Sequence, residues 1–133
     1  MTRLLFVIVA AASLSAQSSP VATWRAQHER QIVDELMQIV AIPNVAGTDA
    51  DMQRNVEHLA GLFRRRGFTV ETSTGAGSPV LFATLDAPSP RGTLTLYIHY
   101  DGQPVTASEW TRCKPFAPCL YGPTGEVALS PTT

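Results

Sequence analysis

The sequence lacks an excess of charge of either sign. Ten Lys and Arg residues stand against eleven Asp and Glu residues, which gives a formal net charge of −1 over 133 residues. A nucleic-acid-binding protein, or a protein that lies on a charged membrane surface, would carry a basic excess or a run of like charge. The composition argues against both classes, and a hydrophobic content of 44% is ordinary for a globular protein.

Several motifs that would define a catalytic class are also missing. The chain has no Gly-x-Ser-x-Gly element, no glycine-rich loop ahead of a Lys-Ser/Thr pair, and no His-x-His or His-Glu-x-x-His pattern. Cysteine is scarce, and Cys113 and Cys119 do not form a Cys-x-x-Cys zinc or redox motif. Their loop, "CKPFAPC", is compatible with a disulfide and equally with two unpaired thiols.

Long apolar runs are absent too, since none reaches the roughly 20 residues that a transmembrane helix needs. One shorter run, residues 4–12, follows the single basic residue Arg3 and precedes a stretch of small residues. This layout predicts a secretory signal peptide over residues 1–16, cleaved after Ser15 or Ala16, in preference to a buried helix. We therefore expect an exported chain, periplasmic or secreted, without stable membrane insertion after cleavage.

Two segments show the spacing of amphipathic helices. The first runs over residues 23–41 and is stopped by Pro43. The second runs over residues 49–66 and ends before Gly67, a residue that favours a left-handed C-terminal cap. Its predicted buried stripe consists of Met52, Val56, Leu59, Ala60 and Phe63.

Three strand-like segments follow: "FTVETST", "PVLFATLD" and "TLTLYIH". Short turn sequences separate them and favour antiparallel neighbours. Two helices followed by three strands predict an α/β class. The last two strands are apolar on both faces, so helices are expected on both sides of the sheet. With two helices only, one sheet face and one edge stay open, and we expect the isolated chain to be marginally stable.

The third predicted strand ends in His99, with Asp101 two positions later, in "YIHYDGQPV". Residues two apart in an extended chain point to the same side, so the imidazole and the carboxylate are expected together at the sheet's edge. Neutral imidazole is a common zinc ligand, and its second ring nitrogen usually donates to a carboxylate. Taken alone, a His-x-Asp pair is more often an ordinary surface pair than a metal site.

Other charged residues have simpler interpretations. His28 and His58 lie off the apolar stripes of the two helices and are expected to be solvated. The three arginines 64–66 fit the C-terminal end of a helix dipole better than a phosphate site.

Four longer stretches resemble one family in the same order along the chain. "LYIHYDGQPV" resembles the first metal-binding motif of the M20 zinc metallopeptidases, and "EWTRCKPFAPCLYG" resembles the Trp…Pro-Phe-x-Pro segment after it. "ELMQIVAIPNV" and "NVEHLAGLFRRRGFTVET" resemble the family's first two helices and first strand. The Asp-Gly-Gln-Pro-Val version is similar to that of dipeptidases and carboxypeptidases.

This resemblance implies the N-terminal part, residues 17–133, of a catalytic domain with a larger mixed sheet. It implies a site with two zinc ions, or other divalent ions, that hydrolyses peptide or dipeptide substrates. His99 corresponds to a metal ligand, and Asp101 to the catalytic-site aspartate that orients it. Two such ions would polarise the carbonyl and activate a shared water.

The chain also departs from the family pattern. Ile98 stands where a small residue is common, and we expect it to pack into the core. The bridging aspartate, the general-base glutamate and the other ligands are expected beyond residue 133. Glu126 lacks the Glu-Glu context of the base and is expected to be an exposed carboxylate. A catalytic zinc site needs three protein ligands, so the chain alone is expected to be inactive. The alternative is a non-catalytic truncated or decayed remnant.

Overall fold

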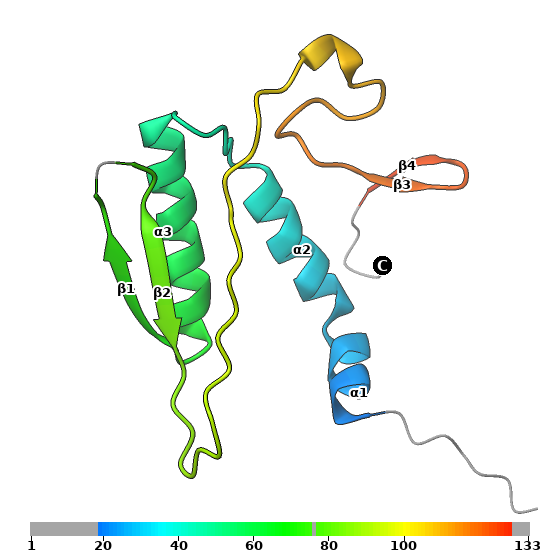
Figure 1. Cartoon of the computed structure of the whole chain (residues 1–133). Helices are drawn as coiled ribbons and strands as arrows, with labels where there is room; N and C mark the ends of the chain where they lie inside the picture. The colour runs from blue at the N-terminus through cyan, green and yellow to red at the C-terminus, as the bar shows by residue number, and fades with distance from the viewer. Residues whose placement is uncertain (1–18, 76, 129–133) are drawn as a thin grey trace, which may run out of the picture.

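The computed structural model describes residues 19–75 and 77–128, and the predicted signal peptide lies outside these residues. The described elements are three α-helices, a 3-10 turn and two small antiparallel sheets, which agrees with the coarse α/β prediction (Figure 1). In sequence order they are α1 (Pro20–Gln27), α2 (Glu29–Val40), α3 (Asp49–Arg65), β1 (Thr69–Ser73), β2 (Val80–Thr84), η1 (Ala107–Glu109), β3 (Leu120–Gly122) and β4 (Gly125–Val127). None of the described helices has the length and apolar character that a membrane span requires.

The first predicted helix is two helices in the structure. The break falls at His28, whose backbone φ of −118° is not helical. Its ring stacks on Trp24 with centroids 4.1 Å apart, and its Nδ1 donates a hydrogen bond to the Trp24 carbonyl at 2.7 Å. A side chain that bonds to the preceding turn competes with the helical ladder, which explains a break that apolar spacing does not predict.

Helix α3 matches its predicted span to within one residue at its C-terminal end. Met52, Val56 and Ala60 are buried as predicted, and Gly67 has the left-handed φ of +84° expected after the helix. Leu62 and the polar Asn55 are buried outside the predicted stripe, whereas Leu59 and Phe63 of that stripe are half-buried.

Strands β1 and β2 pair in antiparallel register, with Val70 opposite Ala83. One face of this two-stranded sheet packs on α3 and carries the half-buried residues Val70, Leu81 and Ala83 (Figure 1). The opposite face leaves Phe82 64% exposed. An open sheet face was expected from the small number of helices, and the open face is the one that carries Phe82 of β2.

The predicted third strand is wrong. Residues 93–99 are extended but belong to no sheet, and they are exposed throughout, with Leu96 at 74% and Ile98 at 79% (Figure 1). Ile98 therefore does not pack into a core in this structure. A strand is stabilised by hydrogen bonds to a neighbour, and β1 and β2 form a sheet with each other alone. The β-prone residues 93–99 favour an extended conformation, but the described residues provide no neighbouring strand for them to pair with.

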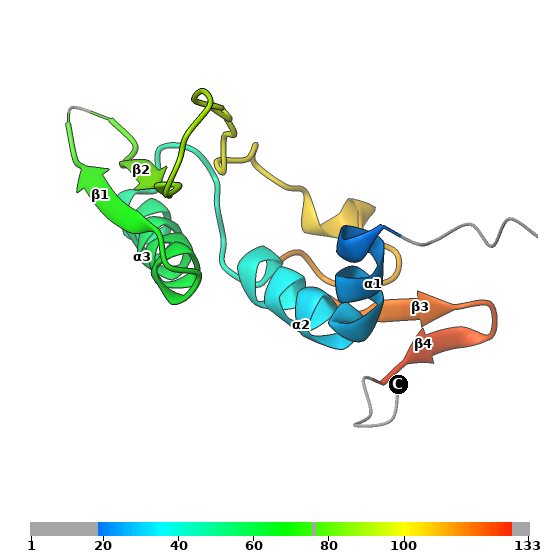
Figure 2. The ribbon, with the colours of Figure 1, turned by 90° about the horizontal axis from the view of Figure 1, so that it is seen from below.

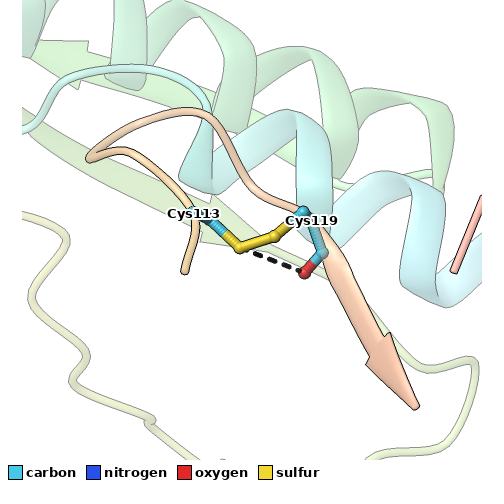
Figure 3. The surroundings of a disulfide bond; sticks show 2 residues. All are labelled: Cys113 and Cys119. Atoms are coloured by element: carbon cyan, nitrogen blue, oxygen red, sulfur yellow. Dashed lines mark hydrogen bonds between the residues drawn. A yellow bond between two sulfur atoms is a disulfide. The ribbon is translucent and has the colours of Figure 1, made fainter. Parts of the chain in front are cut away.

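The last described segment carries a disulfide between Cys113 and Cys119, the alternative that the sequence left open (Figure 3). The bridge closes the loop that leads into the β3–β4 hairpin. In both views this hairpin lies on the other side of α2 from the β1–β2 sheet (Figure 1 and Figure 2). Glu126 lies on β4 and is exposed, as expected.

Candidate functional site

The structure brings His99 and Asp101 together, as the sequence predicts. Nδ1 of His99 lies 3.2 Å from Oδ1 of Asp101 and 3.0 Å from the Asp101 main-chain carbonyl oxygen. The His99 side chain is 75% exposed and that of Asp101 43% exposed. The pair lies in an extended segment outside both sheets, so the expected position at a sheet edge is wrong.

The two Asp101 oxygens near Nδ1 determine which ring nitrogen of His99 has a free lone pair. Both are acceptors, so Nδ1 carries the proton and donates it in the neutral ring. Nε2 then presents a lone pair, and none of the described residues contacts it through a hydrogen bond. An imidazole that donates from Nδ1 to a carboxylate and offers Nε2 to solvent has the arrangement of a metal-ligating histidine with its orienting partner.

The segment around His99 is attached to the rest of the chain through Asn44. The main-chain N–H of Gly102 donates to the Asn44 carbonyl at 2.7 Å, and the side-chain Nδ2 of Asn44 donates to the Tyr100 carbonyl at 3.1 Å. Ala46 N–H donates in turn to the Gly102 carbonyl at 3.0 Å. We refer to these contacts between residues 44–46 and 100–102 as the Asn44 junction. It holds the backbone on the C-terminal side of His99.

The two segments of the Asn44 junction approach each other closely at Gly102. A Cβ atom at this position would lie 3.0 Å from Oδ1 of Asn44 and 3.1 Å from its Nδ2. Such distances are shorter than ordinary van der Waals contact, so a larger residue requires the Asn44 side chain to shift by a few tenths of an ångström. The Gly in "YDGQP" thus has a local steric role next to the candidate site.

The Asn44 junction is fastened to α3 by Asn55. This residue is only 3% exposed, and its Nδ2 donates to the Pro43 carbonyl at 2.7 Å and to the Asp51 carbonyl at 2.9 Å. Both of its side-chain protons therefore have acceptors in a buried position. Sequence analysis missed Asn55, although its spacing from Met52 and Val56 places it on the buried face of the helix.

Tyr100 provides a third attachment, because its hydroxyl donates to the carbonyl of Pro79, directly before β2. Burial raises the pKa of the Tyr100 hydroxyl above its usual value, and the negative charge of Asp101 raises it further. The hydroxyl stays a neutral donor over the physiological pH range. Asp101 thereby lies between two anchored residues, Tyr100 and Gly102, and His99 directly precedes Tyr100, while the His99 side chain remains exposed.

The other two histidines do not join this pair. His28 is half-buried and stacked on Trp24. His58 is half-buried on α3, and its Nε2 is buried without a hydrogen-bond partner. The expectation that both are solvated is therefore wrong for His58, and His28 is partly solvated. For His58 the reason is that Leu62, which lies one turn further along the same side of α3, is buried.

The described residues supply a hydrogen-bonded imidazole–carboxylate pair, but not a complete metal site. Over residues 19–75 and 77–128, no three His, Cys, Asp or Glu side chains lie close enough to hold an ion together. A catalytic zinc ion needs three protein ligands. His99 and Asp101 thus fit part of a metal centre, and no hydrolytic step can be assigned to the described residues alone.

Arg66, the last of the three arginines at the end of α3, makes contacts within the fold. Arg66 donates from Nη1 to the Leu62 carbonyl at 3.1 Å, in the last turn of the helix, and from Nη2 to the Glu35 carboxylate. The contact with the Leu62 carbonyl supports the helix-end interpretation for Arg66.

Comparison of the chain with protein-family models, with curated proteins and with solved structures found no match.

Proposed function

We propose that the chain is the N-terminal part of an exported, metal-dependent exopeptidase of the M20 type, a dipeptidase or carboxypeptidase. In this proposal His99 binds one of two zinc ions through Nε2, and Asp101 orients the ring. The observation that carries the proposal is the hydrogen bond from Nδ1 of His99 to Asp101, with Nε2 left exposed. The order of four M20-like stretches along the chain supports the same family.

Two features support export. Residues 1–16 have the layout of a signal peptide. The Cys113–Cys119 disulfide is a bond that persists in oxidising compartments and is rare in the cytosol. The mass of the chain recovered from the periplasm or medium of an expression host tests this point, and we expect it to begin at Ala16 or Gln17.

A second candidate function follows from the incomplete ligand set. A truncated or decayed remnant would retain His99 and Asp101 without activity of its own. Over the described residues no three His, Cys, Asp or Glu side chains lie together, so neither candidate assigns a hydrolytic step to these residues alone. Both candidates predict that this chain alone does not hydrolyse dipeptides in the presence of zinc.

The coding sequence downstream of codon 133 separates the two candidates. The peptidase proposal expects a further aspartate ligand and a Glu-Glu pair there. A chain that includes this continuation should cleave simple dipeptides, lose activity on chelation and regain it with zinc. His99→Ala should abolish turnover, whereas His28→Ala, a histidine that is stacked on Trp24, should not. Full activity of the His99→Ala variant would contradict the proposal.

A further inference from the structure

The sequence contains a single Asp-Gly bond, and it lies at the candidate site, between Asp101 and Gly102. The main-chain nitrogen of a residue that follows an aspartate can attack the aspartate side chain, and a glycine in that place allows the close approach because it has no Cβ atom. Every other aspartate in the sequence is followed by a residue that has one. The Asp101 side chain is also 43% exposed, so solvent reaches it.

We propose that Asp101 is a site of isoaspartate formation, and that the Asn44 junction keeps this modification slow in the folded chain. In the reaction the main-chain nitrogen of Gly102 forms a bond to Cγ of Asp101, and the carboxyl hydroxyl leaves with the amide proton as water. Water then opens the succinimide ring. Attack at Cγ regenerates aspartate, whereas attack at the main-chain carbonyl carbon leaves the chain linked through the side chain, as isoaspartate. The reaction consumes no oxidant, reductant or cofactor.

The Asn44 junction engages the attacking nitrogen. The N–H of Gly102 donates to the Asn44 carbonyl at 2.7 Å, within an isolated parallel bridge between Val45 and Gly102. The carboxylate under attack is engaged as well, because Oδ1 of Asp101 lies 3.2 Å from Nδ1 of His99. Ring closure has to turn the Gly102 nitrogen away from Asn44 and towards Cγ of Asp101. The rate therefore follows the fraction of molecules in which the junction is open.

The close approach at Gly102 explains why the susceptible bond and its protection occur together. A Cβ atom at this position would lie 3.0 Å from Oδ1 of Asn44, so the junction favours glycine, and glycine is what makes Asp101 susceptible. Isoaspartate adds a methylene group to the main chain and moves the carboxylate from its place beside His99. The modified chain thus loses the imidazole–carboxylate pair, whether or not a metal is bound there.

Incubation of the purified chain, followed by trypsin digestion and chromatography of the peptides, tests the proposal. Peptide 92–112 contains Asp101 as its only aspartate, and peptide 67–91 contains the exposed Asp86, followed by Ala87, as an internal control. Electron-transfer fragmentation identifies isoaspartate, which has the same mass as aspartate. In guanidinium chloride we expect isoaspartate to accumulate faster at Asp101 than at Asp86. In the folded chain its accumulation at Asp101 should be at least about fivefold slower than in the denaturant.

Asn44→Ala tests the role of the junction. This variant removes the donor to the Tyr100 carbonyl, so isoaspartate should form at Asp101 about fivefold faster in the folded chain. Gln53→Ala, on the exposed side of α3, is the matched control and should leave the rate unchanged. Asn44→Asp removes the same donor without a change in size, and it replaces Asn44→Ala if circular dichroism shows that the alanine variant does not fold.

Three results would overturn the proposal. The first is equal accumulation at Asp101 and Asp86 in denaturant, and the second is equal accumulation at Asp101 with and without denaturant. The third is a folded Asn44 variant that forms isoaspartate no faster than Gln53→Ala. The readout is the linkage within one peptide, so a failure here is distinct from a failure of the peptidase proposal.

Discussion

Arg66, which follows α3, donates a hydrogen bond from its guanidinium to the carboxylate of Glu35 on α2. The two residues are 31 positions apart, and their contact joins the two helices that flank the loop containing Asn44. The hydrogen bond from Arg66 lowers the pKa of Glu35, and this effect outweighs the opposing effect of partial burial.

The first prediction concerns the pH dependence of stability. Because the folded-state pKa of Glu35 lies below its unfolded value of 4.5, the pair stabilises the fold above pH 4.5. That stabilisation is lost as the pH falls from 4.5 through the lower folded-state pKa. Arg66→Gln should reduce the free energy of unfolding by less than about 1 kcal/mol at pH 7, since the pair is partly exposed.

Urea unfolding at several pH values measures this effect. The difference between the unmodified chain and Arg66→Gln should shrink as the pH falls below 4.5. Arg64→Gln removes a charge from the same helix end without touching Glu35 and serves as the control. A difference that is constant down to the lowest pH would exclude Glu35 as the partner that matters.

The second prediction concerns the buried amide of Asn55. Asn55→Ala leaves the Pro43 carbonyl without its donor, so we expect a loss of about 2 kcal/mol in the free energy of unfolding. Gln53→Ala, on the exposed side of the same helix, should change stability by less than about 0.5 kcal/mol. Equal losses in the two variants would show that the Asn55 contacts contribute nothing specific.

The third prediction concerns the close approach at Gly102. Gly102→Ala should displace the Asn44 side chain and break its hydrogen bond to the Tyr100 carbonyl. The main-chain N–H of Ala46, which donates to Gly102, should then exchange with solvent deuterium faster. Gly92→Ala meets nothing within 4 Å and should leave this exchange rate unchanged. Unchanged protection of Ala46 in both variants would contradict the proposed steric role.

The fourth prediction concerns the tautomer of His99. In the neutral ring the proton should reside on Nδ1, because two oxygens accept from that atom. Long-range proton–nitrogen NMR correlations distinguish the two tautomers. Asp101→Ala should raise the population with the proton on Nε2, while the tautomer of His28, fixed by the Trp24 carbonyl, should not change. A predominant Nε2–H form in the unmodified chain would remove the basis for metal binding through Nε2.

Local sequence patterns are sufficient to predict the elements that depend mainly on residues close in sequence. Helix α3 follows from the spacing of Met52, Val56 and Ala60, and Gly67 ends it because that position needs a positive φ. β-prone runs bounded by turn residues locate β1 and β2, which need only each other. The proximity of His99 and Asp101 also follows from their spacing in an extended chain.

Local sequence patterns do not predict features that depend on contacts with other parts of the fold. The segment 93–99 has the sequence of a strand, yet pairing requires a neighbour that its own residues do not specify. The break at His28 depends on a ring stacked on Trp24. Asn44 and Asn55 are ordinary polar residues by composition, and only the fold shows that they connect the candidate site to α3. Membership of the M20 family stays a prediction.

The Asn44 junction has a consequence for the order of folding. Asn44 and Tyr100 are 56 positions apart, and closing so long a loop of unfolded chain is entropically costly. All of α3, β1 and β2 lies between them. If these elements form first, they shorten the flexible connection between Asn44 and Tyr100. Asn55 of α3 then holds Pro43, next to Asn44, and Pro79, next to β2, offers its carbonyl to Tyr100. We therefore expect the surroundings of His99 to be assembled last, after the helix and hairpin that support them.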